Sequence, residues 1–132
     1  MKIIRIAYWA STGLLCLMYL GGAFVYLTQR DMVVEAFGRF GYPAYLVTPL
    51  LIAKILGPVA ILWRKSMALS DLAYAAMLFH LLFALSAHLS VRDGGYGFAL
   101  AGLVLLAVSF FTQNYVRPGW SPHAGRRLGT WS

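Results

Sequence analysis

The stretch that decides the fold is Ala44-Tyr-Leu-Val-Thr-Pro-Leu-Leu-Ile-Ala-Lys54-Ile-Leu-Gly-Pro58-Val-Ala-Ile-Leu-Trp63, an apolar run with one charged residue. It has the length that a helix needs to cross about 30 Å of hydrocarbon. A lysine at that depth costs several kcal/mol unless it is paired, hydrated or deprotonated. Four residues later, the ring of Pro58 displaces the backbone carbonyl of Lys54 itself. The side chain and the freed carbonyl together predict a polar site inside a membrane helix.

The composition extends this interpretation to the whole chain. Hydrophobic residues are 61% and charged residues 11% of the 132 positions, whereas about 25% of a soluble domain is charged. Apolar stretches of spanning length cover residues 6–28, 44–63, 69–90 and 96–116. No stretch alternates with period two, as a barrel strand would. The sequence therefore predicts an all-α integral membrane four-helix bundle over residues 1–116. The first stretch is too long for a signal-peptide core, so we expect a retained helix.

The basic residues predict the orientation. With the N-terminus inside, the cytoplasmic set is Lys2, Arg5, Arg64, Lys65, Arg117, Arg126 and Arg127. The opposite set is Arg30, Arg39 and Arg92. This excess predicts both termini in the cytoplasm, with a bacterial cytoplasmic membrane as the expected location. Because the charge of +7 follows the membrane topology and not a soluble basic face, nucleic acid is not an expected partner. Residues 117–132 lack apolar periodicity and are predicted to form a basic flexible cytoplasmic tail.

The linker between the first two spans has helical spacing of its own. Apolar residues stand at positions 32, 33, 36, 37 and 40. Asp31 is the expected N-cap, and Glu35 can pair with Arg39 at i,i+4. We expect a short amphipathic helix at the outer interface. The alternative is a solvated connector.

The third span carries further polar groups on one helical stripe. At 100° per residue, the stripe holds Tyr74, Met77, Leu81, Ala84 and His88, with His80 at its edge. Asp71 begins this span and is expected to cap it. An interfacial histidine is the alternative to a site role for His88.

Counting along the helices places Lys54 and His80 at about the same depth. If they face each other, a neutral imidazole can accept a hydrogen bond from the ammonium, or a neutral amine can donate. The alternative is that each side chain bonds a backbone carbonyl, Lys54 reaching the one that Pro58 frees.

Several familiar kinds of site are not expected. The chain has one cysteine, Cys16, which excludes an internal disulfide. His80 and His88 are eight residues apart, about 12 Å along a helix, so they cannot both ligate one metal ion. No metal site and no cofactor motif is evident from the sequence.

Six pieces of the chain, in order, resemble the DoxX-like family of small four-helix membrane proteins. They are Gly21-Gly22, Val33-Val34-Glu35-Ala36-Phe37, Gly41-Tyr42-Pro43-Ala44, Ala53-Lys54-Ile55-Leu56-Gly57, Asp71-Leu72-Ala73-Tyr74-Ala75 and Ser86-Ala87-His88-Leu89. The resemblance covers about residues 5–116 and implies the four-helix fold. The chain departs from it at Tyr26, where relatives often have Lys, and at His80, where they often have an acid. The family is named for quinone-linked sulfur oxidation, and its other members are subunits or accessory membrane proteins.

Two function classes follow, and the sequence does not say whether the protein is an enzyme. The first is binding of a small lipophilic ligand, with a quinone as one candidate, as a component of a membrane oxidoreductase system. Its candidate ligand-binding residues are Lys54, Tyr74, His80, His88, Tyr26 and Glu35. The second is a non-catalytic subunit or assembly factor, whose partner is another membrane protein or a second copy of the chain. A cavity joining Lys54, Tyr74, His80 and His88 would favour the first class.

Overall fold

The computed structural model describes residues 2–92, 94–117 and 121–124, and these residues form helices without any strand. The elements are α1 (Lys2–Thr28), α2 (Arg30–Phe40), a 3-10 turn η1 (Ala44–Leu46), α3 (Val47–Trp63), α4 (Met67–Val91) and α5 (Tyr96–Val116). Four segments are long and apolar enough to cross a membrane: α1, η1 with α3, α4 and α5. The predicted all-α, four-span architecture is confirmed. The largest difference from the predicted spans is at the start of α1, which begins at Lys2.

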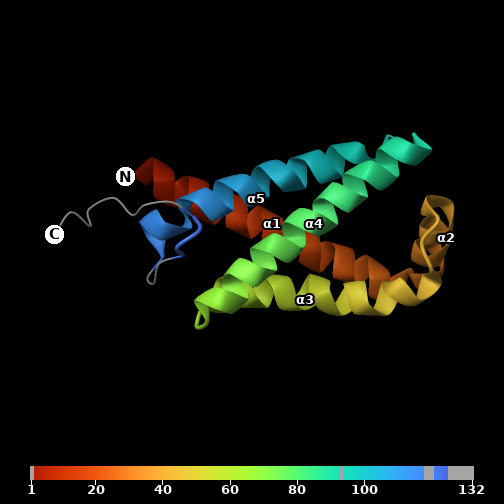
Figure 1. Ribbon diagram of the computed structural model, residues 1–132, viewed down its shortest axis with the longest axis horizontal. Helices are drawn as coiled ribbons and strands as arrows, with labels where there is room; N and C mark the ends of the chain where they lie inside the picture. The colour runs from red at the N-terminus through yellow and green to blue at the C-terminus, as the bar shows by residue number, and fades with distance from the viewer. Residues whose placement is uncertain (1, 93, 118–120, 125–132) are drawn as a thin grey trace.

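The four long helices form a ring. α1 packs against α3 and α5, and α4 packs against the same two helices. Figure 1 shows that the long helices cross one another at an angle and spread apart toward both ends of the molecule. At one end, here the tail end, the N-terminus and residues 121–124 lie near the end of α5. At the other end, here the α2 end, the α4–α5 pair diverges from the α1–α3 pair, and α2 stands beside the opening.

Apolar side chains cover both the inside and the outside of the bundle. Inside, Leu15, Tyr19, Ile61, Met77 and Leu81 belong to one buried cluster. Outside, large apolar side chains remain exposed on every spanning helix, with Ile3 at 82% and Phe98 at 78%. A soluble protein rarely exposes so continuous an apolar surface, whereas a bilayer covers it with lipid tails. The chain is therefore an integral membrane protein.

α2 confirms the predicted short helix in the linker, with one correction. The helix begins at Arg30 behind Gln29, so Asp31 lies in the first turn and is not the N-cap. Gly41 ends the helix in the left-handed region, at φ 81°, which a residue with a Cβ rarely adopts. The backbone N–H groups of Gly41 and Tyr42 donate to the carbonyls of Gly38 and Phe37, a Schellman ending.

Two contacts hold α2 against the start of α3. Val33 and Phe37 bury their side chains against Val47 of α3. The Arg30 guanidinium donates to the Thr48 hydroxyl at 2.8 Å. The helix is thus fastened to the start of α3.

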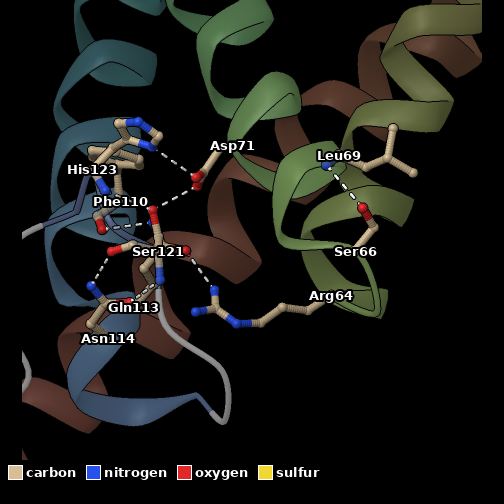
Figure 2. A network of polar contacts seen from close by, with 9 residues as sticks. All are labelled: Arg64, Ser66, Leu69, Asp71, Phe110, Gln113, Asn114, Ser121 and His123. Atoms are coloured by element: carbon tan, nitrogen blue, oxygen red, sulfur yellow. Dashed lines mark hydrogen bonds and ion pairs between the residues drawn. The ribbon is translucent and has the colours of Figure 1, made fainter.

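The prediction that Asp71 caps α4 is wrong. The helix begins at Met67, and Ser66 is its N-cap, accepting from the Leu69 N–H at 3.3 Å. The Asp71 carboxylate instead points toward the C-terminal segment (Figure 2). It accepts from the Ser121 hydroxyl at 2.8 Å and pairs with His123 Nδ1 at 3.1 Å. A partner that lies 50 residues away in the sequence gave no local signal.

The C-terminal segment is therefore packed where the structure describes it. Ser121 and Ala124 are buried, and the Asn114 side chain bonds both the N–H and the carbonyl of Ser121 at 2.8 Å. The sequence did not predict this packing. The rest of the predicted flexible tail, residues 118–120 and 125–132, lies outside the described residues.

Polar contacts also join the helices in the half of the bundle nearest the tail end. The Ser109 hydroxyl lies 2.6 Å from Thr12 Oγ1 and 2.6 Å from the Tyr74 hydroxyl, so it links α1, α4 and α5. The Arg64 guanidinium donates to Gln113, a fully buried side chain (Figure 2). Such bonds between membrane helices contribute about 0.6 kcal/mol each on average. The tail-end half is thus both packed and hydrogen-bonded.

Candidate functional site

A cavity of about 600 Å³ occupies the α2 end of the bundle, here the main cavity. It brings together four of the six residues predicted for the site: Tyr26, Lys54, His80 and His88. Most of its remaining wall is apolar or aromatic, and α2 contributes Phe37 and Phe40. Volume and lining are typical of a site for a small lipophilic molecule.

Lys54 lies at the deep end of the cavity between two tyrosine rings of α1. Its Nζ is 5.1 Å from the centroid of the Tyr19 ring and 5.0 Å from that of Tyr26. Tyr19 and Tyr26 are seven residues apart, so both lie on one face of the helix. The negative faces of aromatic rings attract a cation, by about 0.5–2 kcal/mol per ring. This only partly offsets the cost of several kcal/mol for a lysine at mid-membrane.

Gly22, between the two tyrosines, allows the Lys54 side chain to lie close to α1. A Cβ at position 22 would lie 3.3 Å from Lys54 Nζ, closer than ordinary van der Waals contact. At the neighbouring Gly21, a Cβ would meet no atom within 4 Å. The helix face of Tyr19, Gly22 and Tyr26 therefore forms a cradle for the Lys54 side chain.

His80 is joined to the same cradle through Tyr19. The Tyr19 hydroxyl lies 2.9 Å from His80 Nδ1 and 3.4 Å from the Met77 carbonyl. When the hydroxyl donates to Nδ1, the nearer acceptor, the imidazole proton resides on Nε2. We expected either a direct Lys54–His80 bond or bonds to backbone carbonyls. The structure shows a third arrangement, in which Tyr19 contacts both residues.

A second cavity, of about 390 Å³, lies on the other side of Lys54, between α1, α3 and α4. Lys54 and His80 line this cavity and the main cavity alike, as do Leu50 and Ala76. The two polar side chains thus stand in the partition between two apolar spaces. A ligand in either space would contact them.

Two predicted site residues lie elsewhere. Tyr74 is buried among the tail-end contacts with Ser109 and Phe110, and it lines a separate groove of about 540 Å³ between α4 and α5. Glu35 is exposed on α2 and does not line the main cavity. Tyr19, which was not predicted as a site residue, lies beside Lys54 and His80 instead.

Aromatic side chains surround the mouth of the main cavity. Phe37 meets Tyr26 edge to face at 6.0 Å between centroids, and Phe40 meets His88 at 5.1 Å. Phe83 and Phe98 line the cavity yet are 63% and 78% exposed, so the cavity opens toward the surrounding lipid. A hydrophobic molecule could enter from the membrane without crossing water.

The main cavity has no acidic side chain among the described residues that line it. Its ionisable side chains are a lysine, two histidines and two tyrosines, and none of them is Asp or Glu. Nor do any three His, Cys, Asp or Glu side chains in the described part of the chain lie close enough to hold a metal ion. The arrangement can donate hydrogen bonds to an oxygen atom and place a positive charge beside it.

The fold and this cavity define the class: a small α-helical integral membrane protein with a polar site in mid-bundle. The family follows from comparison with known proteins. Residues 10–131 match the model of the DoxX-like family, and the chain belongs to that family. The match extends past α5 into the segment that contains Ser121. No curated protein and no solved structure matches the chain.

Proposed function

We propose that the protein binds a small lipophilic ligand in the main cavity, with the polar head of the ligand between Lys54 and His80. The observation that supports this proposal is the convergence of both side chains on one largely apolar cavity. A quinone is one candidate, because its carbonyl oxygens accept hydrogen bonds and its body is flat and apolar. A role as a component of a membrane oxidoreductase system would follow from such a ligand and from the family.

The site would hold the ligand in one orientation. The ligand enters from the lipid past Phe83 and Phe98, and its body lies against the aromatic residues of α2. Its head reaches Lys54 Nζ, which the Tyr19–Gly22–Tyr26 cradle holds in place, and the free nitrogen of His80. An amine and an imidazole beside a carbonyl can stabilise negative charge that develops on its oxygen.

Retained ligand is the direct test. Wild-type protein, purified in a mild nonionic detergent, is measured by native mass spectrometry beside Ala84→Leu, which narrows the main cavity. Ala101→Leu is the matched control, because Ala101 is exposed on α5 and lines none of the three cavities. We expect a lipophilic compound, distinct from bulk phospholipid, on the wild type and on Ala101→Leu but not on Ala84→Leu. Equal retention in all three, or none in the wild type, would contradict the proposal.

The alternative is a non-catalytic subunit or assembly factor in which Lys54 and His80 only hold helices together. In that case the wild type retains no small molecule and co-purifies with a membrane partner. The same preparation therefore separates the two classes.

The positive-inside distribution further supports an inner-membrane location with both termini in the cytoplasm. Replacing buried Cys16 by Ala leaves a background for single cysteines at Lys65 and Tyr45. In intact cells, an impermeant maleimide should label Tyr45→Cys and not Lys65→Cys. The reverse labelling pattern would contradict the proposed orientation.

A further inference from the structure

The charges around the main cavity do not balance. Lys54 places its amine at the deep end, where two tyrosine rings and Gly22 enclose it. The chain has four acidic residues. Asp31 and Glu35 are exposed on α2, Asp71 is bonded to Ser121 and His123 at the tail end, and Asp93 lies outside the described residues. Among the described residues that line the cavity, Lys54 therefore has no carboxylate as a counter-ion.

Buried cations in proteins are normally paired, and aromatic faces are weaker partners than carboxylates. The remaining polar contacts at the deep end add donors and not negative charge. When the Tyr19 hydroxyl donates to His80 Nδ1, the other imidazole nitrogen carries the proton and can donate it to a ligand. A cation beside a hydrogen-bond donor is a site for an oxygen atom that carries charge.

We infer that the ligand of the main cavity is a lipophilic oxyanion, whose charged head pairs with Lys54 and whose apolar body fills the space under α2. This inference rests on the proposed function and narrows its ligand class. Two sources share the chemistry: a long-chain carboxylate, and an acidic enol such as a 2-hydroxyquinone. A neutral quinone would leave the Lys54 charge without a counter-ion.

The shape of the cavity agrees with such an amphiphile. Lys54 of α3 and His80 of α4 line its deep end, whereas Phe37, Phe40 and Phe98 line it nearer the α2 end. The exposed side of Phe98 faces lipid. An amphiphilic acid would thus enter head first from the membrane and leave its tail toward the opening.

Two matched pairs of probes isolate the charge from the shape. One pair is palmitic acid and its methyl ester, and the other is a 2-hydroxy-3-alkyl-1,4-naphthoquinone and its 2-methoxy ether. Dissociation constants are measured for the purified full chain in a nonionic detergent by native mass spectrometry titration. Wild type is compared with Lys54→Met and with Lys65→Met, which removes a lysine outside the cavity.

We expect the acid of at least one pair to bind about tenfold or more tightly than its neutral partner, the ratio expected for one charge-assisted hydrogen bond. This preference should disappear in Lys54→Met and persist in Lys65→Met. The pair that shows it identifies the source of the oxyanion.

Other outcomes overturn the inference in distinguishable ways. If acid and neutral probes bind the wild type equally and Ala84→Leu weakens both, the cavity is a binding site for neutral lipophiles, and only the charge argument fails. If the preference for the acid persists in Lys54→Met, the charge that is recognised is not that of Lys54. If no probe of either pair binds and the wild type retains no compound after purification, the proposed function fails as well.

Discussion

The hydroxyl of Tyr19 lies 2.9 Å from Nδ1 of His80 and joins α1 to α4 across the bundle, although these helices are not adjacent in the ring. The ring of the same tyrosine faces Lys54 Nζ at 5.1 Å. One side chain therefore contacts both polar groups of the site. The position of His80 and that of Lys54 are coupled through Tyr19.

The contribution of the Tyr19–His80 hydrogen bond can be measured by a double-mutant cycle. Tyr19→Phe keeps the ring beside Lys54 and removes the hydroxyl, and we expect a loss of about 0.5–1.5 kcal/mol in the free energy of unfolding. His80→Leu removes the other partner. The double variant should lose less than the sum of the two, because the bond is lost only once. Unfolding in one detergent checks this, with Tyr26→Phe as control, since the contacts that the structure describes for Tyr26 involve its ring. If the losses of the two single variants simply add in the double variant, the Tyr19–His80 hydrogen bond does not contribute to stability.

Lys54→Met separates a binding role from a structural one. Met is similar in length to Lys and removes its charge. The contacts of Lys54 with the two tyrosine rings offset only part of the free-energy cost of burying that charge. We expect a melting temperature equal to or above that of the wild type, together with loss of the retained compound. A drop in melting temperature of several degrees with unchanged retention would show that Lys54 holds helices together and does not bind the ligand.

Gly22→Ala tests the cradle without touching Lys54. The new methyl group would lie 3.3 Å from Nζ, so the flexible lysine side chain must move. Because Ala favours the helix by up to about 1 kcal/mol over Gly, we expect unchanged or slightly higher stability and weaker ligand binding. Gly21→Ala has the same propensity gain in open space, and it should leave binding unaltered. Equal ligand binding by the two variants would show that Gly22 has no role in the site.

Gly102→Ala should destabilise the bundle, because Gly102 of α5 packs directly against Leu81 of α4. Its Cβ would lie 2.7 Å from Leu81 Cδ2 and 3.1 Å from Met18 Cε, inside a packed core. Overpacking of this kind costs about 1–3 kcal/mol. At Gly57 the Cβ would meet only the flexible end of Met77, at 2.8 Å, so Gly57→Ala should cost less. Unfolding of both variants in one detergent gives the ranking, and the opposite order would contradict the packing described at Gly102.

Asn114→Ala tests the docked C-terminal segment. The change leaves the buried N–H and carbonyl of Ser121 without their side-chain partner, at about 1–3 kcal/mol for each unsatisfied group. We expect lower stability and faster proteolysis after residue 117. Pro122→Ala is a useful control, because Pro122 is exposed. A cleavage rate equal to that of wild type would mean that the Asn114–Ser121 bonds do not hold the segment.

The spans could be predicted because apolar length alone specifies a membrane helix. Lys54 could be selected because a charge inside such a helix is rare. His80 was placed at the right depth because rise per residue is constant. Counting along helices does not fix rotation, however, and Tyr74 was assigned to the site although it faces Ser109 in the other half of the bundle.

Tyr19 and the role of Asp71 were missed for different reasons. A single tyrosine in an apolar span is ordinary. Tyr19, Gly22 and Tyr26, however, are spaced at i, i+3 and i+7 and so lie on one helix face, with the small residue between the two tyrosines. That spacing could have indicated Tyr19 as a site residue. For Asp71 there was no such signal. Its partners, Ser121 and His123, come from a segment of different composition, and only the folded chain brings them together.

The polar contacts between helices are unequally distributed between the two ends of the bundle. Hydrogen bonds through Ser109, Asn114 and Arg64 tie the helices where the chain begins and where its last described residues lie, whereas the opposite ends diverge around a largely apolar space. We expect the α2 end, where the helices surround the main cavity, to deform more easily than the hydrogen-bonded tail end. Because the main cavity opens toward lipid at that end, the thickness and packing of the surrounding lipid layer would then tune the affinity of the site.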